Sequence, residues 1–386
     1  MRLRHLSEGA HATVRIVAFM AGIWLPLAAT FWASGSGRMD AMEKRKLADL
    51  PKFKLTRERL NAYPSDFNRY FDDNFGMREK LVGLHSYLKG IGLNVSPIRN
   101  AIIGKDGWLY LGDGNIVADY RNAHPFTETE LRQWRDVLVA KRDWLAQRGV
   151  RYLFVVAPDK HTIYPEHMPN RFNKVSSRSC LDQLIAYMKA NSDFEIVDLR
   201  PALNAEKATV RVFHKTDTHW NDRGAFVAYR EIMRAASAQL PELKPRDEAD
   251  FRAVEYPSAG RDLANMMGLR ALMRERVLRL VPKFQPCAQP AAITLPPDFQ
   301  GPNHEPGHEP FAMECSTARL KAVVFRDSFG TALVPYLSEH FRRTAYIWHY
   351  PNRIVMNAVI VSERPDIVIE ERVERHLKPL LPDFKQ

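Results

Sequence analysis

The sequence predicts an α/β protein whose central parallel sheet is covered by helices on both faces. Two observations support this prediction. Short apolar segments of strand length alternate with segments of helical periodicity from residue 127 onward. Two polar motifs follow predicted strands, and ligands of parallel sheets bind at the carboxyl ends of the strands. The expected strands are 152–156, 194–199, 321–325, 344–348 and 367–369.

The helices between these strands carry end signals as well as periodicity. Thr127 and Glu130 form a capping-box pattern, and Gly149 is a stop signal after the periodic segment. Asn221 is an N-cap residue for a helix that runs to about Leu240. Further helices are expected over 181–189 and 354–362, so strands and helices alternate as parallel crossovers require.

The chain is expected to have three parts. They are an N-terminal segment over 1–38, a helical lead-in over 39–100 and the α/β domain over 101–386. Residues 104–111 are expected to form a turn and a strand, since Asp-Gly at 106 and 107 is a strong turn signal. Residues 282–318 carry no period and are expected to form an irregular insertion, which is a lid, a partner surface or a long loop.

Residues 14–33 form the single apolar stretch of membrane length in the sequence. At about 1.5 Å per residue a helix of this length reaches roughly the 30 Å of a bilayer core. We interpret it as an uncleaved signal-anchor, and the alternative is a signal peptide cleaved near residues 33–35. Arginines and lysines flank both sides of the stretch, so their count does not decide the orientation.

The composition of the 386 residues is that of an ordinary globular chain, with a formal net charge of +11. This positive charge suits an anionic partner, such as an acidic polysaccharide or an anionic lipid, or it belongs to an ordinary solvated surface. The sequence contains no P-loop, zinc-finger or RNA-binding motif, so we expect no nucleic-acid partner.

Three cysteines are present. Cys287 and Cys315 bracket the insertion, and a disulfide between them would restrain it. Zinc binding by these two cysteines with His304 and His308 is the alternative, although their spacing matches no usual zinc pattern. Cys180 lies on a predicted amphipathic helix and is expected to be a small buried hydrophobe.

Two motifs suggest acyl-transfer chemistry. Asp217 and His219 are two residues apart, so on an extended segment they point the same way and the carboxylate can orient the imidazole. Ser328 lies in Phe-Arg-Asp-Ser-Phe-Gly between a predicted strand and helix, where helix-start amides can hold an oxyanion. We predict Ser328 as nucleophile, His219 as general base and Asp217 as the residue that orients it. The nearest rivals for these roles are Asp222, Asp327 and His214.

The combination of Asp-Thr-His-Trp with a late Asp-Ser-Phe-Gly turn resembles the periplasmic alginate O-acetyltransferases. Segments of similar type and order occur upstream, at 70–78, 104–111 and 158–166, and the segment 258–263 resembles one that follows the Asp-His motif in the family. The resemblance covers roughly residues 40 to 380. It implies a three-layer SGNH hydrolase-like fold with a circularly permuted order of motifs, and a domain that lies in the periplasm and is anchored in the inner membrane.

The resemblance also implies the activity. It would be an O-acetyltransferase that forms an acetyl-serine intermediate and acetylates an exported polysaccharide, with an anionic, alginate-like acceptor favoured by the basic surface. A membrane acyl-transferase would supply the acetyl group, and other export proteins would be partners. The alternatives are a polysaccharide acetyl-esterase with the same triad and a non-catalytic glycan-binding scaffold. No cofactor or metal is expected.

Five further residues are candidates for oxyanion or substrate contacts. Arg326 precedes the turn of Ser328 and could place a guanidinium near the developing charge, or pair with a nearby acidic residue. Trp220 could stack on a sugar ring or hold the loop. The other three follow a predicted strand and resemble family positions, as glycan contacts or as site support: Lys160, His161 and Tyr164.

Overall fold

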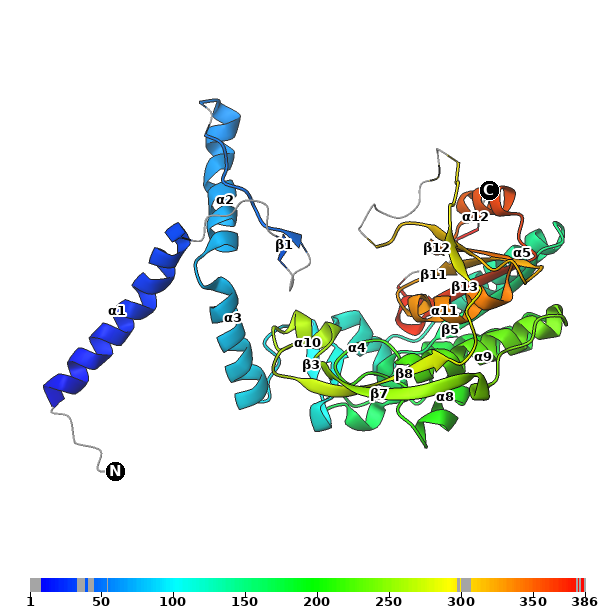
Figure 1. Ribbon diagram of the computed structural model, residues 1–386, viewed down its shortest axis with the longest axis horizontal. Helices are drawn as coiled ribbons and strands as arrows, with labels where there is room; N and C mark the ends of the chain where they lie inside the picture. Colours follow the sequence, from blue (N-terminus) through cyan, green and yellow to red (C-terminus); the bar gives the residue numbers. More distant parts are fainter. Residues whose placement is uncertain are drawn as a thin grey trace. The chain divides into compact units, whose positions relative to one another are not determined.

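The computed structural model describes residues 8–32, 39–40, 45–53, 55–296, 299, 307–379, 381 and 383–384. The chain divides into two compact units (Figure 1). The first comprises residues 1–98 with 264–270, and the second comprises 99–263 with 271–386. All the predicted site residues belong to the second unit.

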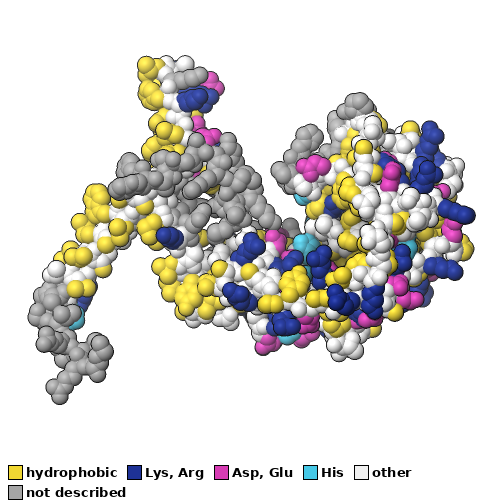
Figure 2. Space-filling view, in the orientation of Figure 1, with side chains coloured by type: hydrophobic (Ala, Val, Ile, Leu, Met, Phe, Trp, Pro, Cys, Tyr) yellow, Lys and Arg dark blue, Asp and Glu magenta, His cyan; other side chains and the backbone are white. Residues whose placement is uncertain are grey.

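The first unit begins with α1 (Glu8–Trp32). Within the described residues, α1 alone contains a segment long and apolar enough to cross a membrane, His11–Thr30, and none of that segment is buried. Figure 2 shows its apolar side chains exposed along the helix. Length and composition of this kind suit a signal sequence as well as an anchor. The predicted cleavage region at 33–35 lies outside the described residues.

The rest of the first unit is mainly helical. Thr56 caps α2 by accepting a hydrogen bond from the Arg59 amide. Aromatic side chains form a stripe along α2, where the Phe67 ring stacks on Tyr63 at 6.1 Å and on Phe71 at 6.5 Å. The elements are α2 (Arg57–Asn74), α3 (Arg78–Tyr87), the π-helical turn η1 (Leu88–Gly92) and a small antiparallel pair, β1 (Met39–Asp40) and β2 (Arg45–Lys46).

The second unit is built on a seven-stranded sheet of order β6-β5-β13-β11-β12-β10-β9. The first five strands in this order are parallel, and the last two pair antiparallel. The strands are β5 (Arg151–Ala157), β6 (Val197–Asp198), β9 (Gln289–Ala291), β10 (Phe311–Glu314), β11 (Lys321–Arg326), β12 (Arg343–Trp348) and β13 (Ile367–Val373).

All five predicted strands are present and parallel, but the prediction of a purely parallel sheet is wrong at one edge. There β9 and β10, from the region predicted to be irregular over 282–318, extend the sheet. Strands of three and four residues are too short to show a period of two. Pro290 within β9 is typical of an edge strand, where a missing N–H is tolerated. Residues 297–298 and 300–306 lie outside the described residues.

Helices cover both faces of the sheet, because successive strand residues point to opposite sides. Leu153 and Val155 of β5 join the hydrophobic core under α9, whereas Phe154 and Val156 join the core under α5, α7 and α12. Figure 1 shows α9 and α12 on opposite sides of the strands. The helices are α5 (Glu128–Ala146), α7 (Cys180–Asn191), α9 (Asp222–Gln239) and α12 (Arg353–Glu363).

The end signals that were used to predict the helices act as expected. Thr127 and Glu130 form the capping box of α5, and Asn221 Oδ1 accepts the Gly224 amide at the start of α9. The Asp-Gly pair at 106 and 107 lies in a turn, η2 (Lys105–Gly107), and both residues have positive φ, 54° and 76°. This turn joins β3 (Ala101–Ile103) to β4 (Leu109–Leu111).

The remaining elements of the chain are short, apart from the long antiparallel ribbon of β7 and β8. They are α4 (Gly114–Tyr120), α6 (Lys160–Ile163), η3 (Pro165–His167), α8 (Arg200–Lys207), η4 (Glu248–Asp250), β7 (Phe251–Ala259), α10 (Asp262–Met266), β8 (Arg274–Pro282), η5 (Phe329–Leu333), α11 (Val334–Leu337), η6 (Ser338–His340) and η7 (Glu374–His376).

Cys287 and Cys315 form a disulfide, with their Cα atoms 4.9 Å apart. The alternative zinc site is therefore wrong for these residues, because neither cysteine is left as a thiolate; His304 lies outside the described residues. Cys180 is free and half-buried, and its thiol donates to the His124 carbonyl. Burial raises the pKa of the Cys180 thiol to about 12, which argues against a nucleophile.

Replacing both bridged cysteines with serine is expected to lower the free energy of unfolding by about 3 kcal/mol, because the bridge closes a loop of 28 residues in the unfolded chain. Urea unfolding of the double variant and of the wild type measures this difference. The reduced wild type should match the double variant, and Cys180→Ser serves as the control. Equal unfolding midpoints for oxidised wild type and double variant would contradict the expectation.

Candidate active site

Asp217 and His219 lie in a tight loop between β-bridge partners Phe213 and Trp220. The loop is closed by the His214 amide, which donates to the His219 carbonyl at 3.3 Å. The prediction that Asp217 and His219 lie on an extended segment at a strand end is therefore wrong. The two side chains meet for a different reason: Asp217 Oδ1 accepts the His219 amide at 3.2 Å and the His219 ring Nδ1 at 2.8 Å. This is an Asx-type turn, a local structure that the residue spacing alone does not predict.

The electrostatics of this pair suit a base and its orienting carboxylate. Burial alone would raise the pKa of Asp217, but the hydrogen bond from His219 lowers it well below its ordinary value. Arg261 Nε contacts the other oxygen, Oδ2, at 3.1 Å. With Nδ1 donating to Asp217, the neutral ring has a lone pair on Nε2. That atom has no hydrogen-bond partner among the described residues.

The turn that contains Ser328 is held mainly by Asp327. Asp327 Oδ1 accepts the Phe329 amide at 2.9 Å, and Oδ2 accepts the Val373 amide at 2.8 Å and the Tyr350 hydroxyl at 2.7 Å. Asp327 is thus committed to the turn and does not approach the role of Asp217. Ser328 itself is half-buried, directly before η5. Because the Phe329 amide is bonded to Asp327, it is not available as an oxyanion donor.

The glycine after the turn is required by close packing. A Cβ on Gly330 would lie 2.7 Å from Arg326 Cβ and 3.0 Å from Glu371 Oε2. Glu371 Oε2 also accepts the Asp327 amide at 3.0 Å, which ties the turn to β13. Burial, with Asp327 nearby, raises the pKa of Glu371 well above its ordinary value.

The loop and the turn meet at Phe329. The centroid of its ring lies 5.0 Å from that of His219 and 5.1 Å from that of Trp220. Since Ser328 directly precedes Phe329, the predicted nucleophile and the predicted base lie in the same neighbourhood, at the carboxyl end of β11. Trp220 is buried and packs edge-on against Phe329, so it holds the loop and presents no face to a sugar.

Lys160 and Tyr164 hold the backbone of the loop that contains Asp217 and His219. The Lys160 ammonium donates to the backbone carbonyls of His214, Lys215 and Asp217, at 3.1, 3.2 and 2.5 Å. Burial lowers the pKa of Lys160 to about 7. The Tyr164 hydroxyl accepts the Val212 amide at 3.0 Å, directly before the loop. Of the two predicted roles, site support fits both residues better than glycan contact, because both side chains are buried.

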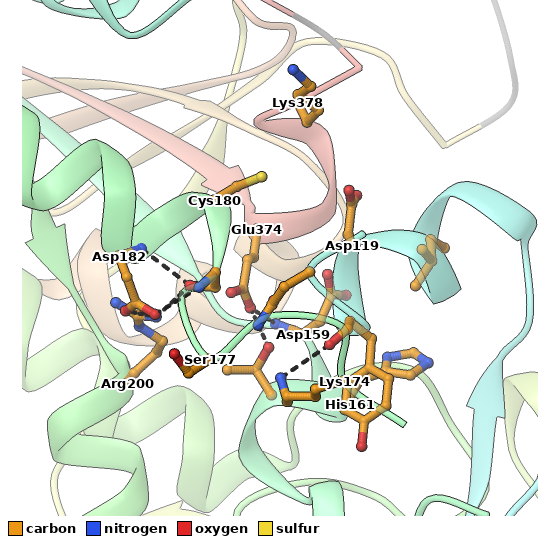
Figure 3. A pocket seen from close by; sticks show the side chains of 15 residues that line it. Asp119, Asp159, His161, Lys174, Ser177, Cys180, Asp182, Arg200, Glu374 and Lys378 are labelled. Carbon is orange, nitrogen blue, oxygen red and sulfur yellow. Dashed lines mark hydrogen bonds and ion pairs between the residues drawn. The ribbon is translucent and has the colours of Figure 1, made fainter. Parts of the chain in front are cut away.

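His161 is not part of this cluster. Its Nε2 bonds to the Leu111 carbonyl at 2.9 Å, and burial lowers the pKa of the ring to about 4. It lines a separate cavity of about 100 Å³ at the same edge of the sheet, near β5, β6 and β13 (Figure 3). Figure 3 shows Asp159 and Glu374 on the wall of this cavity together with His161.

Arg326 is turned toward the antiparallel edge of the sheet. Its Nη1 donates to the Asp327 carbonyl at 3.1 Å and to Thr331 Oγ1 at 2.9 Å, and its guanidinium carbon lies 4.7 Å from the Trp348 ring and 5.4 Å from the Phe311 ring. The side chain is buried. Through these contacts Arg326 packs against the turn that contains Ser328.

The other rivals are held elsewhere. Asp222 Oδ2 accepts the Leu280 amide at 3.1 Å. The His214 ring lies 3.9 Å from Glu275, and burial lowers its pKa to about 4. No group of three or more His, Cys, Asp and Glu residues that could hold a metal ion occurs in the part of the chain that the structure describes.

Two residues that hold the loop were not predicted, Glu275 and Arg261. Glu275 of β8 accepts the Thr216 amide and hydroxyl with one oxygen, at 3.1 and 2.5 Å, and the Lys215 amide with the other, at 2.9 Å. Arg261 lies in the segment 258–263, and the resemblance of that segment to the family could have pointed to this residue. For Glu275 no signal existed, because its partners are about 60 residues away in the chain.

Glu275→Gln is expected to destabilise the protein by about 1–3 kcal/mol, since a side-chain NH₂ would face amide donors. Burial opposes ionisation of Glu275, but the Thr216 and Lys215 hydrogen bonds lower its pKa on folding. The carboxylate therefore stabilises the protein above the unfolded-state pKa, about 4.3, and loses that effect as pH falls through the folded-state pKa.

The test of this expectation is urea unfolding of both proteins at several pH values. The difference in unfolding free energy should be largest near neutral pH and should shrink toward acid pH. A difference that is constant with pH would contradict the role of the Glu275 carboxylate. Glu255→Gln is the matched control, because Glu255 lies on the neighbouring strand β7 in an exposed ion pair with Arg276.

Residues 101–292 match the family model described as the SGNH hydrolase-like domain of the acetyltransferase AlgX. The chain is 28% identical over 204 residues to the probable alginate O-acetylase AlgJ of Pseudomonas syringae pv. tomato, which covers 53% of this chain and 50% of the relative. It is 32% identical over 124 residues to the protein of the same name from Pseudomonas aeruginosa, covering 32% of this chain and 30% of the relative. These alignments span half or less of each relative's length.

A solved structure of Bacillus cereus PatB1 matches with a TM-score of 0.52 at 19% identity, covering 74% of this chain and 100% of that chain. This likeness shows a shared fold. Together the matches confirm the SGNH hydrolase-like α/β fold and the resemblance that the motifs predicted.

Proposed function

We propose that this chain transfers acetyl groups to hydroxyls of an exported polysaccharide. The match of residues 101–292 to the SGNH hydrolase-like acetyltransferase model and the similarity to probable alginate O-acetylases support this proposal. The observation that carries the proposal is the Asp217–His219 pair, joined at 2.8 Å, whose ring packs on the residue next to Ser328. Ser328 is the proposed nucleophile, His219 the general base and Asp217 the residue that orients the base.

The first half-reaction follows from the tautomer of His219. Nε2 takes the proton of the Ser328 hydroxyl as Oγ attacks the carbonyl carbon of an acetyl ester, and the carbonyl electron pair moves onto oxygen. The charge is then held by donors that include the Ser328 amide. The oxyanion collapses, the leaving alcohol takes the proton from His219, and acetyl-Ser328 remains.

The second half-reaction uses the same groups in the reverse order. His219 takes the proton of a sugar hydroxyl, whose oxygen attacks acetyl-Ser328, and returns the proton to Ser328 Oγ as the acetyl ester of the sugar leaves. Water as the acceptor would give hydrolysis by the same steps. Binding of the glycan and exclusion of water therefore decide between transferase and esterase.

We also propose the motif order of the domain, its cellular location and its partners. A late nucleophile that follows the His motif in the chain corresponds to the circularly permuted motif order. We place the domain in the periplasm, with α1 as an anchor in the inner membrane, a membrane acyl-transferase as the acetyl donor and other export proteins as partners. The exposed apolar surface of α1 supports the anchor. An anionic, alginate-like polymer is the proposed acceptor, since the chain carries a formal net charge of +11.

The test uses the full chain purified in detergent, with p-nitrophenyl acetate as donor and three oligosaccharide sets as acceptors: mannuronate, glucuronate and cello-oligosaccharides. Mass spectrometry measures acetyl gain on each glycan. Acetylated uronates that form with the wild type and not with Ser328→Ala are the expected result. Release of acetate that depends on Ser328 and that no glycan diverts would identify an esterase. Polymer binding without any turnover would favour the scaffold.

A further inference from the structure

The proposed chemistry needs hydrogen-bond donors near the carbonyl oxygen, and the Arg326 guanidinium is engaged elsewhere. Its contacts to Thr331, Trp348 and Phe311 draw it toward the antiparallel edge of the sheet. A second arginine, Arg375, packs on the ring of Phe329 in the turn. It belongs to η7, which directly follows β13, and β13 pairs with β11 in the sheet. Arg375 therefore follows the carboxyl end of the strand beside Ser328.

Arg375 contacts the same aromatic ring as the base. Its guanidinium carbon lies 5.4 Å from the centroid of the Phe329 ring, and the His219 ring lies 5.0 Å from that centroid. Phe329 is the residue that follows Ser328. The base, the nucleophile and this guanidinium thus gather around one side chain.

Asp159 fixes the guanidinium at one end. Asp159 Oδ1 accepts Arg375 Nη1 at 2.5 Å, and Oδ2 accepts the Arg375 amide at 3.0 Å. The Asp159 amide in turn donates to Glu374 Oε2 at 3.1 Å. Figure 3 shows Asp159 and Glu374 among the residues that line the neighbouring cavity.

The other nitrogens of Arg375 remain available. Nε and Nη2 donate to no group in the part of the chain that the structure describes, and neither belongs to the fully enclosed polar atoms that lack partners. The side chain is 9% exposed, so these donors retain some accessible surface. Burial would lower the pKa of Arg375, but the carboxylate of Asp159 raises it above its ordinary value, so the group stays cationic.

We propose that Arg375 is a catalytic residue that donates an N–H hydrogen bond to the substrate carbonyl oxygen as it becomes an oxyanion, and that Asp159 positions its guanidinium. This inference rests on the proposed acetyl transfer through Ser328. The carbonyl electron pair moves onto oxygen when Oγ attacks, and Arg375 stabilises that charge without gaining or losing a proton. The charge disappears when the intermediate collapses, and the same donors serve the second half-reaction.

The experiment measures kcat and KM for p-nitrophenyl acetate with the full chain in detergent. Arg375→Gln is expected to lower kcat about 10²-fold with little change in KM, because the contact strengthens only in the transition state. Arg375→Lys should retain an intermediate kcat, since a point charge replaces a planar fork. Arg375→Ala should regain activity when guanidinium chloride is added below unfolding concentrations, and the wild type should not respond.

Arg200→Gln is the matched control. Arg200 follows β6 at the same edge of the sheet and is paired with Asp198 and Asp182, so its loss reports the general cost of removing an ion-paired arginine there. Asp159→Asn covers the case in which the Arg375 variants do not fold. It retains the cation and should lower kcat by roughly tenfold, with KM unchanged, through poorer positioning.

The outcomes separate this inference from the proposed function. An Arg375→Gln variant with the kcat of the wild type would overturn the role of Arg375. So would a loss of kcat that Arg200→Gln matches and that guanidinium does not relieve in Arg375→Ala. In both cases the Ser328 mechanism would stand. Wild-type kcat in folded Asp159→Asn would overturn the positioning role. Activity that survives Ser328→Ala would remove the proposed function itself.

Discussion

Ser328→Ala is expected to reduce turnover of p-nitrophenyl acetate by about 10⁴-fold or more. The proposed route passes through an acetyl ester on Ser328 Oγ, and without that oxygen only the donors around the carbonyl and the binding of substrate remain. The substitution removes one half-buried hydroxyl from a turn whose hydrogen bonds are made by Asp327. The free energy of unfolding should therefore change little.

Two measurements make this result interpretable. Mass spectrometry of wild type quenched during turnover should find an added acetyl group on the peptide that contains Ser328, and none in the variant. Ser338→Ala is the control, because Ser338 is a buried serine that bonds to the Tyr346 hydroxyl and lies away from the turn. If Ser328→Ala retained full activity in a folded protein, the nucleophile assignment would be wrong.

Asp217→Asn is expected to lower kcat by roughly 10³–10⁴-fold. The carboxylate now accepts the Nδ1 proton and so keeps the Nε2 lone pair available for Ser328. An asparagine can turn its NH₂ toward the ring and favour the opposite tautomer, in which Nε2 carries the proton. One oxygen, Oδ1, accepts both the His219 amide and Nδ1, so an NH₂ in its place also removes the acceptor of that amide. Urea unfolding of the variant therefore accompanies the kinetics, and in the folded variant the loss should be mainly in kcat.

The pH profile checks the same assignment. Because the hydrogen bond from His219 lowers the pKa of Asp217 despite burial, the wild type should lose no activity through this group as pH falls to the ordinary range of aspartate, about 3.9. Asp222→Asn is the matched control, since the carboxylate of Asp222 binds the Leu280 amide and not the His219 ring. An Asp217→Asn variant with the activity of Asp222→Asn would disprove the orienting role.

The sequence by itself determined the parallel part of the sheet and the two motifs. Local signals carried these predictions: apolar strand segments, the capping box at Thr127, the Asn221 cap and the turn at Asp106. Each of these acts within a few residues of the chain, so it can be recognised without knowing what packs against it. The short edge strands β9 and β10 were not predicted because they are defined by the pairing of β10 with β12 and of β9 with β10, and not by a local period.

Tertiary structure alone decided which polar residues surround the proposed nucleophile. Lys160, Tyr164 and Glu275 support the loop of Asp217, whereas Arg326 packs away from it and Arg375 lies beside Phe329. Each of these contacts joins segments that are distant in sequence or depends on which way a long side chain turns. Burial and hydrogen-bond geometry decide both, and they exist only once the sheet has brought the carboxyl ends of its strands together.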